Sequence, residues 1–353
     1  MAVNQAHLEL IDALYETENV TDEGLKTLLT DLSEEEREYL REKAEEKRIN
    51  VYGKEVFLRG LIEFTNICKN DCYYCGIRKS NGNVDRYRLT PDQVYACVEA
   101  GYELGFRTFV LQGGEDGHYA TDEVICNLIR GIKERHPDCA LTMSIGERSR
   151  ESYQAMYDAG ADRYLLRHET ANADHYRKLH PDNLTLENRM RCLYDLKDIG
   201  YQVGCGMMIG APYQTLDHYI QDLRFMQNLN PHMIGIGPFI PHKDTCFKDE
   251  PAGTLEETLL MLSILRLLFP KANLPATTAL GTIDPTGREK GILHGANVIM
   301  PNLSPDNVRE NYLLYDNKVG TDVSATQSRA DIERRMATIG YHCVVSRGDS
   351  KVE

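Results

Sequence analysis

Residues 108–136 read TFVLQGGEDGHYATDEVICNLIRGIKERH, and this stretch is the unit from which most of the chain is built. Its β-branched and aromatic start, 108–112, is typical of a buried strand, and the amphipathic run 121–136 has the apolar spacing of a helix. The same pairing recurs along the chain. We expect strands at 56–65, 108–112, 140–145, 163–169, 201–210, 233–240, 275–280 and 297–301, and helices at 90–105, 121–136, 149–160, 185–200, 215–229 and 254–269.

Strands that alternate with helices favour a parallel sheet, so the fold class is α/β. About eight strand–helix units suit a closed (β/α)8 TIM-type barrel, and an open doubly wound sheet is the alternative. Residues 1–50 contain good helix formers, with Ser33 as an expected N-cap and Glu36 three residues later. We therefore predict an N-terminal helical cap at 1–50, with a solvated charged face, and a barrel with a C-terminal extension at 51–353.

The composition excludes several kinds of partner. The 353 residues carry a net charge of −14 and a pI of about 5.3, which opposes binding to nucleic acid. No apolar run is long enough to cross a membrane, and the acidic amphipathic N-terminus is unlike a signal peptide. We expect a cytoplasmic enzyme whose ten cysteines are reduced, and helical Cys97, Cys126 and Cys192 are expected in the core.

The unusual residues follow the expected strands at one end. The carboxyl ends of parallel barrel strands carry the active site, and the segments CKNDCYYCG, QGGED, SIGE, RHET, GMMIGAP and GIGPFIPH all fall there. The first contains Cys68, Cys72 and Cys75, spaced C-x3-C-x2-C. Such a trio suits an iron–sulfur cluster with one iron left open, a zinc site or plain core thiols. Zinc is disfavoured because no fourth ligand follows at a suitable distance.

The cysteine spacing, with Tyr74 before the last cysteine and the motif after the first strand, resembles the radical S-adenosylmethionine (SAM) enzymes. The resemblance implies one 4Fe–4S cluster held by Cys68, Cys72 and Cys75. It also implies that the amino and carboxylate groups of SAM complete the coordination of the open iron. Reductive cleavage of SAM to a 5′-deoxyadenosyl radical is then the expected chemistry.

The same resemblance assigns SAM-binding residues. Gly113, Gly114 and Glu115 match the glycine-rich motif that approaches the methionyl amine, although an ordinary turn would also use glycine. Glu169 would accept hydrogen bonds from the ribose hydroxyls, and Arg189 would pair with the methionyl carboxylate. The remaining SAM-pocket residues would be Tyr74, Ser144 and Met208.

Two arginines suggest a carboxylate-bearing substrate. Arg163 and Arg167 lie four apart on one expected strand, so their side chains should face the same way. Arginines inside a barrel need an anion, and either could instead pair with Glu103, Glu115 or Asp162. By resemblance, Gln112 and Thr142 join them in the substrate pocket, and Met233 either joins them or fills the barrel core.

Longer matching segments narrow the resemblance to one branch. RYLLRHET, GIGPFIPH and GREKGILHGANVIMPN resemble the HydE maturases of FeFe-hydrogenase, relatives of biotin synthase and methylornithine synthase. That branch implies an iron–cysteine organometallic substrate, an electron donor, and the partner maturases HydG and HydF. Some members have a second cluster near the C-terminus, but residues 315–335 lack cysteine, so we predict none.

Two kinds of alternative remain at this point. Another enzyme of the same branch, methylornithine synthase-like or biotin synthase-like, would share most of the motifs. A non-catalytic iron–sulfur carrier would share the cysteines alone, and the arginine and glutamate residues of the expected pocket would then have no use.

Overall fold

The computed structural model describes residues 3–321 and 324–353, and its centre is a parallel sheet. Six strands are hydrogen-bonded in the order β2–β3–β4–β5–β6–β8. Each strand pairs in parallel with the next, and a helix separates them along the chain, as predicted. Their bounds are β2 Gly60–Thr65, β3 Thr108–Gly113, β4 Ala140–Ser144, β5 Arg163–Leu165, β6 Gln202–Cys205 and β8 Met233–Ile234.

Two extended segments close this sheet into a barrel. Asn273 bridges to Met233 of β8, and Pro275 bridges to Val298 of β10 (Val298–Ile299). The chain after β10 then returns to β2, where Asn302 bridges to Leu61 and the Leu303 amide donates to the Leu61 carbonyl at 2.7 Å. The closed ring confirms the barrel and excludes the open doubly wound sheet.

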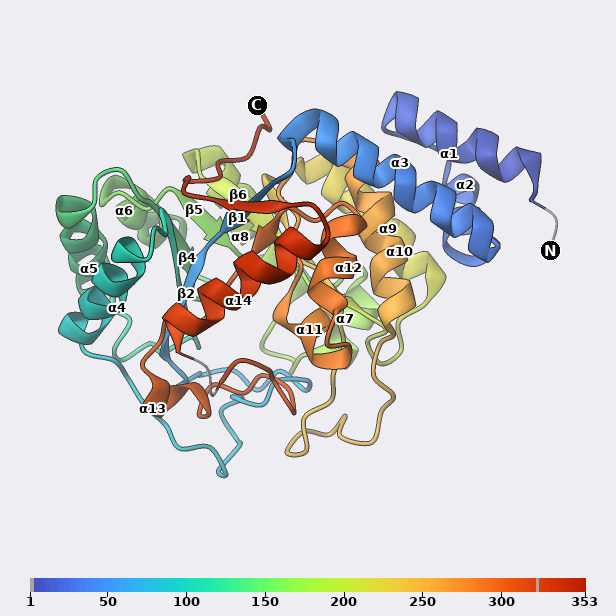
Figure 1. Cartoon of the computed structure of the whole chain (residues 1–353). Helices are drawn as coiled ribbons and strands as arrows, with labels where there is room; N and C mark the ends of the chain where they lie inside the picture. Colours follow the sequence, from blue (N-terminus) through green and yellow to red (C-terminus); the bar gives the residue numbers. More distant parts are fainter. Residues whose placement is uncertain (1–2, 322–323) are drawn as a thin grey trace.

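Six predicted helices cover the barrel, and each begins at a Ser or Thr whose side chain accepts a hydrogen bond from the first turn. Because this cap can be recognised from a few neighbouring residues, the predicted helix starts agree with the structure to within one residue. Figure 1 shows α4, α5 and α6 on one side of the sheet and α9 and α10 on the other. Their bounds are α4 Pro91–Glu103, α5 Asp122–Arg135, α6 Arg150–Asp158, α8 Leu186–Ile199, α9 Leu216–Leu229 and α10 Leu255–Leu268.

Several predicted strands are shorter or broken. The expected strand 201–210 splits into β6 and β7 (Met208–Ile209), and 233–240 splits into β8 and β9 (Gly237–Pro238). The break has a steric cause, because a Cβ on Gly206 would lie only 1.9 Å from the carbonyl oxygen of Gly235. The two backbones touch at these glycines, and β7 and β9 pair separately beyond them.

Two further strand predictions were wrong in part. The run 56–65 forms two strands, because β1 (Glu55–Leu58) joins β10 and β11 (His342–Val344) in a separate sheet. The expected strand 275–280 keeps only its extended start, and Thr277 then leads into helix α11 (Thr278–Ile283), followed by α12 (Gly287–Leu293). Alanine and leucine after Thr277 suit a helix as well as a strand, so the short apolar run was ambiguous.

The N-terminal segment forms three helices, α1 Gln5–Thr17, α2 Asp22–Thr30 and α3 Glu34–Tyr52. Ser33 and Glu36 make the predicted capping box. Most charged residues of α3 lie toward solvent, but Arg48 is fully buried and donates to the carbonyl of Ala296 at 3.2 Å. Helix α3 packs along α10, and the boundary between 50 and 51 stays a prediction.

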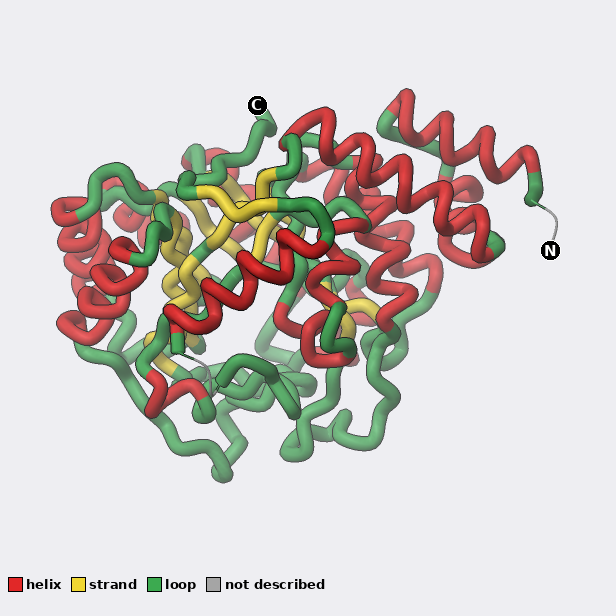
Figure 2. The backbone as a smooth tube through the Cα atoms, in the orientation of Figure 1, coloured by secondary structure: helices red, strands yellow, loops and turns green. Residues whose placement is uncertain are grey.

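The sequence also did not predict helices α7 (Ala173–Leu179), α13 (Asp306–Arg309) and α14 (Ala325–Thr338). Figure 2 shows that the longest loops gather at one end of the barrel, opposite the C-terminus.

Cys97, Cys126 and Cys192 are buried, as predicted. Among the described residues, no helix has the length and apolar character needed to cross a membrane.

Candidate active site

The loop after β2, residues 66–90, carries the three cysteines at the loop-bearing end of the barrel. All three are half-buried. The Cys75 amide donates to the Cys72 carbonyl at 3.2 Å, and the Arg78 amide donates to the Cys75 carbonyl at 3.2 Å, so the segment turns tightly around the last two cysteines.

Burial opposes ionisation of these thiols. It raises the pKa of Cys75 to about 12, with Cys68 as the next cause. It raises the pKa of Cys72 well above its ordinary value, with a further contribution from Cys75 and a smaller one from Cys68. Cys68 raises the pKa of both other thiols and Cys75 raises that of Cys72, so the three share one enclosed neighbourhood, and a metal cation would stabilise their thiolates there.

The residues therefore fit a cluster by their chemistry. No three His, Cys, Asp or Glu side chains within 3–321 and 324–353 already stand as a metal-ligand set. The case for a cluster rests on three half-buried free thiols in one tight loop, with no disulfide among them.

The glycine-rich motif packs directly on the cysteine loop. The Gly114 amide donates to the Thr65 carbonyl at 3.0 Å, and the Lys69 amide donates to the Glu115 carbonyl at 3.0 Å. A Cβ on Gly114 would lie 2.3 Å from the Ile67 carbonyl oxygen and 2.9 Å from Cβ of Cys68. The structure thus gives Gly114 a reason that the sequence did not reveal, because the chain's own cysteine loop fills the space a side chain would need.

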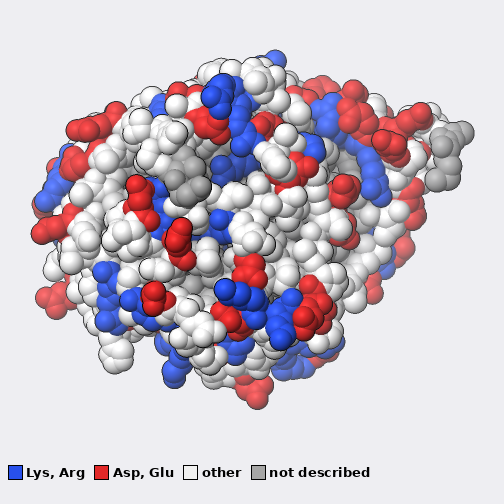
Figure 3. Space-filling model, turned by 60° about the horizontal axis from the view of Figure 1, so that its bottom comes forward, with Lys and Arg blue, Asp and Glu red and all other residues white. Residues whose placement is uncertain are grey.

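Glu115 and its neighbours line an open pocket of about 560 Å³ beside the cysteine loop. The Glu115 carboxylate accepts from the Glu147 amide at 3.0 Å and lies 3.1 Å from Nζ of Lys69. Figure 3 shows that Lys and Arg side chains intermingle with Asp and Glu on the face that carries the loops. The pocket lining includes Lys69, Asn70, Glu115, Glu147, Arg148, Asn183, Asn188 and Arg191.

Glu169 stands out among the predicted residues. It is 6 % exposed, and its backbone has a φ of 63°, a left-handed conformation that costs energy for a residue with a side chain. Its Oε2 accepts no hydrogen bond from the described residues and lies 3.3 Å from Nη2 of Arg167. Nε and Nη2 of Arg167 are likewise buried without a hydrogen-bond acceptor there. Unsatisfied buried groups beside a strained backbone are typical of a ligand site.

Arg189 already has a carboxylate partner. It is buried, its Nε donates to Oε1 of Glu147 at 2.6 Å, and its Nη1 donates to the Arg167 carbonyl at 2.5 Å. Glu147 lies in the SIGE segment, whose acid the sequence left without a role. Any ligand carboxylate would share Arg189 with Glu147.

The other predicted SAM residues lie around this centre. The Tyr74 hydroxyl and Nε2 of His180 are 3.2 Å apart, and burial, followed by Cys72 and Glu169, raises the pKa of Tyr74. Met208 is buried in a small apolar cluster against which Tyr74 packs. Ser144 ends β4 opposite Gln112 of β3 and is half-buried. His180 was not predicted, and no pattern in the sequence marks it.

The predicted substrate residues do not share one pocket. Gln112 donates to the Tyr312 hydroxyl at 3.4 Å. Thr142, Arg163 and Met233 line a cavity of only about 10 Å³ inside the barrel, room for no more than one water molecule. Arg167 lies instead beside Glu169. The premise of a shared strand was wrong, because β5 ends at Leu165.

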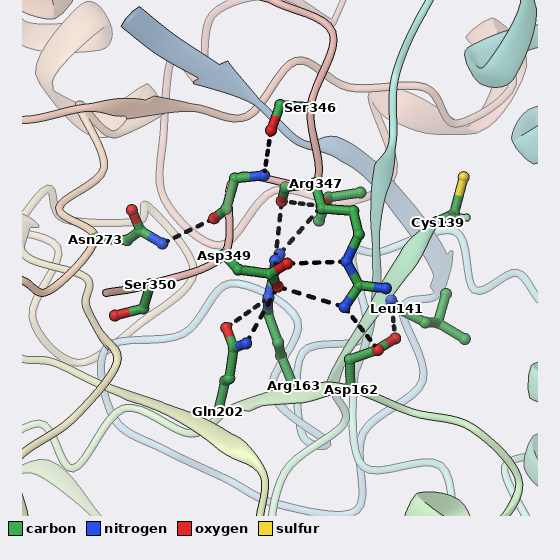
Figure 4. Close-up of polar contacts among 12 residues, drawn as sticks. Cys139, Leu141, Asp162, Arg163, Gln202, Asn273, Ser346, Arg347, Asp349 and Ser350 are labelled. Atoms are coloured by element: carbon green, nitrogen blue, oxygen red, sulfur yellow. Dashed lines mark hydrogen bonds and ion pairs between the residues drawn. The ribbon is translucent and has the colours of Figure 1, made fainter. Parts of the chain in front are cut away.

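Arg163 needs a correction. It is 3 % exposed, and its guanidinium binds the C-terminal tail, with Asp349 Oδ1 at 2.5 Å and the Arg347 carbonyl at 2.9 Å. Figure 4 shows this network, in which Gln202 and Asp162 also take part. None of the partners considered from sequence is the actual one. Arg163 therefore lies at the amino-terminal end of the barrel, and each of its three guanidinium nitrogens already donates a hydrogen bond within the chain.

Comparison with known proteins agrees with this geometry. The model of the Radical SAM superfamily matches residues 62–226, which include the cysteine loop, Glu169 and Arg189. The HydE subunit of the [FeFe] hydrogenase maturase from Thermotoga maritima is 45% identical over 311 residues, covering 88% of each chain. The 3-methylornithine synthase from Methanosarcina barkeri is 31% identical over 309 residues, covering 86% of each chain.

Solved structures agree on the fold. The crystal structure of methylornithine synthase (PylB) has a TM-score of 0.84 at 28% identity and covers 95% of this chain and 97% of its own. The structure of the maturase HydG has a TM-score of 0.83 at 21% identity, with 98% and 77% covered, a likeness of fold alone.

This chain belongs to the radical SAM superfamily, and it is a radical SAM enzyme, as the sequence predicted. Membership implies a 4Fe–4S cluster and SAM as cofactors. Within the superfamily, identity across nearly nine-tenths of both chains places it with the HydE maturases of [FeFe] hydrogenase.

Proposed function

We propose that this enzyme cleaves SAM reductively and takes part in assembling the di-iron subcluster of [FeFe] hydrogenase. Cys68, Cys72 and Cys75 hold its single 4Fe–4S cluster. When cluster and SAM are bound and one electron is supplied, they provide a 5′-deoxyadenosyl radical. No second cluster is included, because residues 315–335, of which 322 and 323 lie outside the described part, contain no cysteine.

The chain's own residues bind and orient SAM in this proposal. Glu169 accepts hydrogen bonds from the ribose hydroxyls through Oε2, which accepts no hydrogen bond from the described residues. Arg189 attracts the methionyl carboxylate while Glu147 holds its guanidinium in place. The Gly113–Glu115 turn presents backbone groups toward the methionyl amine, and Tyr74, Ser144 and Met208 complete the surroundings.

The substrate is a small molecule that bears a carboxylate, specifically an iron–cysteine organometallic synthon. Arg167 supports this assignment, because two of its nitrogens are buried without acceptors beside the SAM site. The other proposed substrate residues lie deeper in the barrel and would contact only the side of a substrate that faces the barrel interior. They are Gln112, Thr142 and Met233. Arg163 no longer belongs to this set.

One observation carries the proposal: buried Glu169, whose backbone is strained, lies beside half-buried Arg167 near the cysteine loop, and buried polar atoms of both side chains lack hydrogen bonds among the described residues. A carrier that only holds a cluster would have no use for such a pair. The partners we propose are HydG, which would supply the substrate, HydF, which would receive the product, and an external one-electron donor. The proposed location is the cytoplasm, without nucleic acid or membrane as partners.

A methylornithine synthase-like activity is the second candidate, favoured by 31% identity to such an enzyme and by the similarity to PylB. The higher identity to a HydE, 45%, favours the first. A biotin synthase-like activity has less support, at 28% identity over 65% of this chain for one biotin synthase.

The first experiment is 5′-deoxyadenosine formation after anaerobic reconstitution and dithionite reduction, with Cys72→Ala as control. No product above the Cys72→Ala level would favour the carrier and refute the enzyme. The second experiment is in vitro maturation of apo-hydrogenase beside incubation with lysine. Restored hydrogenase activity without methylornithine supports the HydE role, and methylornithine without maturation supports the second candidate.

A further inference from the structure

Arg86 ties the cysteine loop together from a single guanidinium. Its Nη1 donates to the carbonyl of Asn66 at 2.7 Å and to that of Ile77 at 2.8 Å. Its Nη2 donates to the carbonyl of Arg78 at 2.6 Å and to that of Asn81 at 3.0 Å. One side chain therefore satisfies four backbone acceptors of the same loop.

The placement of these acceptors is specific. Asn66 lies two residues before Cys68, and Ile77 lies two residues after Cys75. Nη1 thus joins the two ends of the segment that contains all three thiols. Within the segment, only a few backbone bonds hold the chain, such as that between the Cys75 amide and the Cys72 carbonyl. Arg86 is the contact that closes the segment into a ring.

Arg86 also keeps its charge close to the thiols. Its four acceptors are neutral carbonyls, and within residues 3–321 and 324–353 no carboxylate forms an ion pair with it. A positive charge beside the cluster ligands favours the more negative, reduced form of a bound cluster, because net charge and hydrogen bonding set cluster potentials.

We propose that Arg86 is a positioning residue that holds the cysteine loop in its ligand-ready shape before iron arrives and raises the reduction potential of the bound cluster. The redox step concerned is the gain of one electron by the cluster from an external one-electron reductant, with no bond broken and no proton moved. The proposal rests on the proposed function, in which Cys68, Cys72 and Cys75 are the cluster ligands.

Three variants of the full chain separate the two parts of the proposal. Arg86→Gln removes both the positive charge and the branched guanidinium. Arg86→Lys keeps the charge, but a single ammonium group cannot reach four carbonyls. Lys79→Gln is the matched control, because Lys79 is an exposed cation of the same loop whose side chain forms no hydrogen bond or ion pair among the described residues.

The first measurement needs no metal. Iodoacetamide alkylation of Cys68, Cys72 and Cys75 is followed by mass spectrometry in the iron-free protein. Alkylation should be about tenfold or more faster in both Arg86 variants, since even one lost charge-assisted hydrogen bond changes an opening equilibrium by that factor. Lys79→Gln should react at the parent rate. Unchanged rates in both Arg86 variants would overturn the positioning role, and if Arg86→Gln fails to fold, Arg86→Lys alone decides it.

The second measurement is a redox titration of the reconstituted protein, followed by EPR. The midpoint potential should fall in Arg86→Gln and stay at the parent value in Arg86→Lys. Equal potentials in parent and Arg86→Gln, or equal falls in both variants, would overturn the electrostatic role. The iron content of Cys72→Ala distinguishes an error in the proposed cluster ligands from an error in the role of Arg86. Parent-like iron in Cys72→Ala refutes the proposed ligands, whereas lost iron there with parent-like Arg86 variants refutes only the role of Arg86.

Discussion

Replacing Asp349 with alanine tests whether Arg163 is a structural residue. Oδ1 of Asp349 accepts from Arg163 at 2.5 Å and from Gln202 at 3.1 Å, and Oδ2 accepts from Arg347 at 2.9 Å. Arg163 is 3 % exposed, so its charge would lose its carboxylate in the barrel interior. If Arg163 instead served the substrate, Asp349→Ala would affect activity more than stability.

The size of the effect follows from burial. Breaking a fully buried pair costs about 3–5 kcal/mol and an exposed pair about 0–1, so with Asp349 at 40 % exposed we expect about 2 kcal/mol. At about 2.1 cal/mol/K per residue, 353 residues give an unfolding entropy of about 0.7 kcal/mol/K and a fall in Tm of about 3 °C. The double variant Arg163→Met/Asp349→Ala should regain part of this loss, because it leaves no unpaired charge.

Differential scanning calorimetry of the anaerobic full chain measures the shift. Asp174→Ala is the matched control, since its pair with Arg177 is exposed on both sides and should leave Tm unchanged. A Tm for Asp349→Ala within about 1 °C of the parent, or a double variant that is less stable than Asp349→Ala, would refute the reasoning.

Three further predictions concern the site and the cap. Gly114→Ala should push the cysteine loop away and lower iron uptake on reconstitution, with an overpacking cost of about 1–3 kcal/mol, whereas Gly117→Ala, whose Cβ would meet nothing within 4 Å, should bind iron like the parent. Glu169→Gln should lower kcat/KM for SAM about 10–100-fold through loss of a charged acceptor, and exposed Glu187→Gln should not; equal values for the two would contradict ribose binding by Glu169. Hydrogen bonds from His7, and then from the amides of Asn4 and Ser33, lower the pKa of Glu36 from 4.5 to about 2, so the stability it contributes is complete above pH 4.5 and is lost as the pH falls toward 2. Acid unfolding followed by circular dichroism should therefore depend less steeply on pH in Glu36→Gln, and an unaltered acid transition would show that the contact contributes nothing.

Local chemistry made much of the fold predictable. Thr90, Thr121, Ser149 and Thr254 each cap the helix that follows, and a cap needs only residues a few positions away. The strands were harder, because their lengths depend on partners far along the chain. β6 stops where Gly206 meets Gly235, a contact between segments about thirty residues apart that no local pattern reveals.

The residues of the site show the same contrast between what local sequence predicts and what depends on distant contacts. Motif spacing was enough to bring the cysteines, Gly114 and Glu169 to one end of the barrel, and the family resemblance added Arg189. The role of Arg163 was mistaken, because its partner Asp349 is 186 residues away in a tail with no recognisable pattern. Glu147 and His180 were missed for a related reason: each acts on a predicted residue, Arg189 and Tyr74, through a contact that only the folded chain creates.

The way the tail enters the barrel has a practical consequence for anyone handling this enzyme. The carbonyl oxygen of Gly348 accepts from Arg59 and Asn273 inside the molecule. A fluorescent label attached to residues 347–349 would therefore disturb the contacts that fill the amino-terminal end of the barrel. Helix α1 lies on the outside of the helical cap, far from these contacts, and its surface is the sounder place for a label (Figure 1).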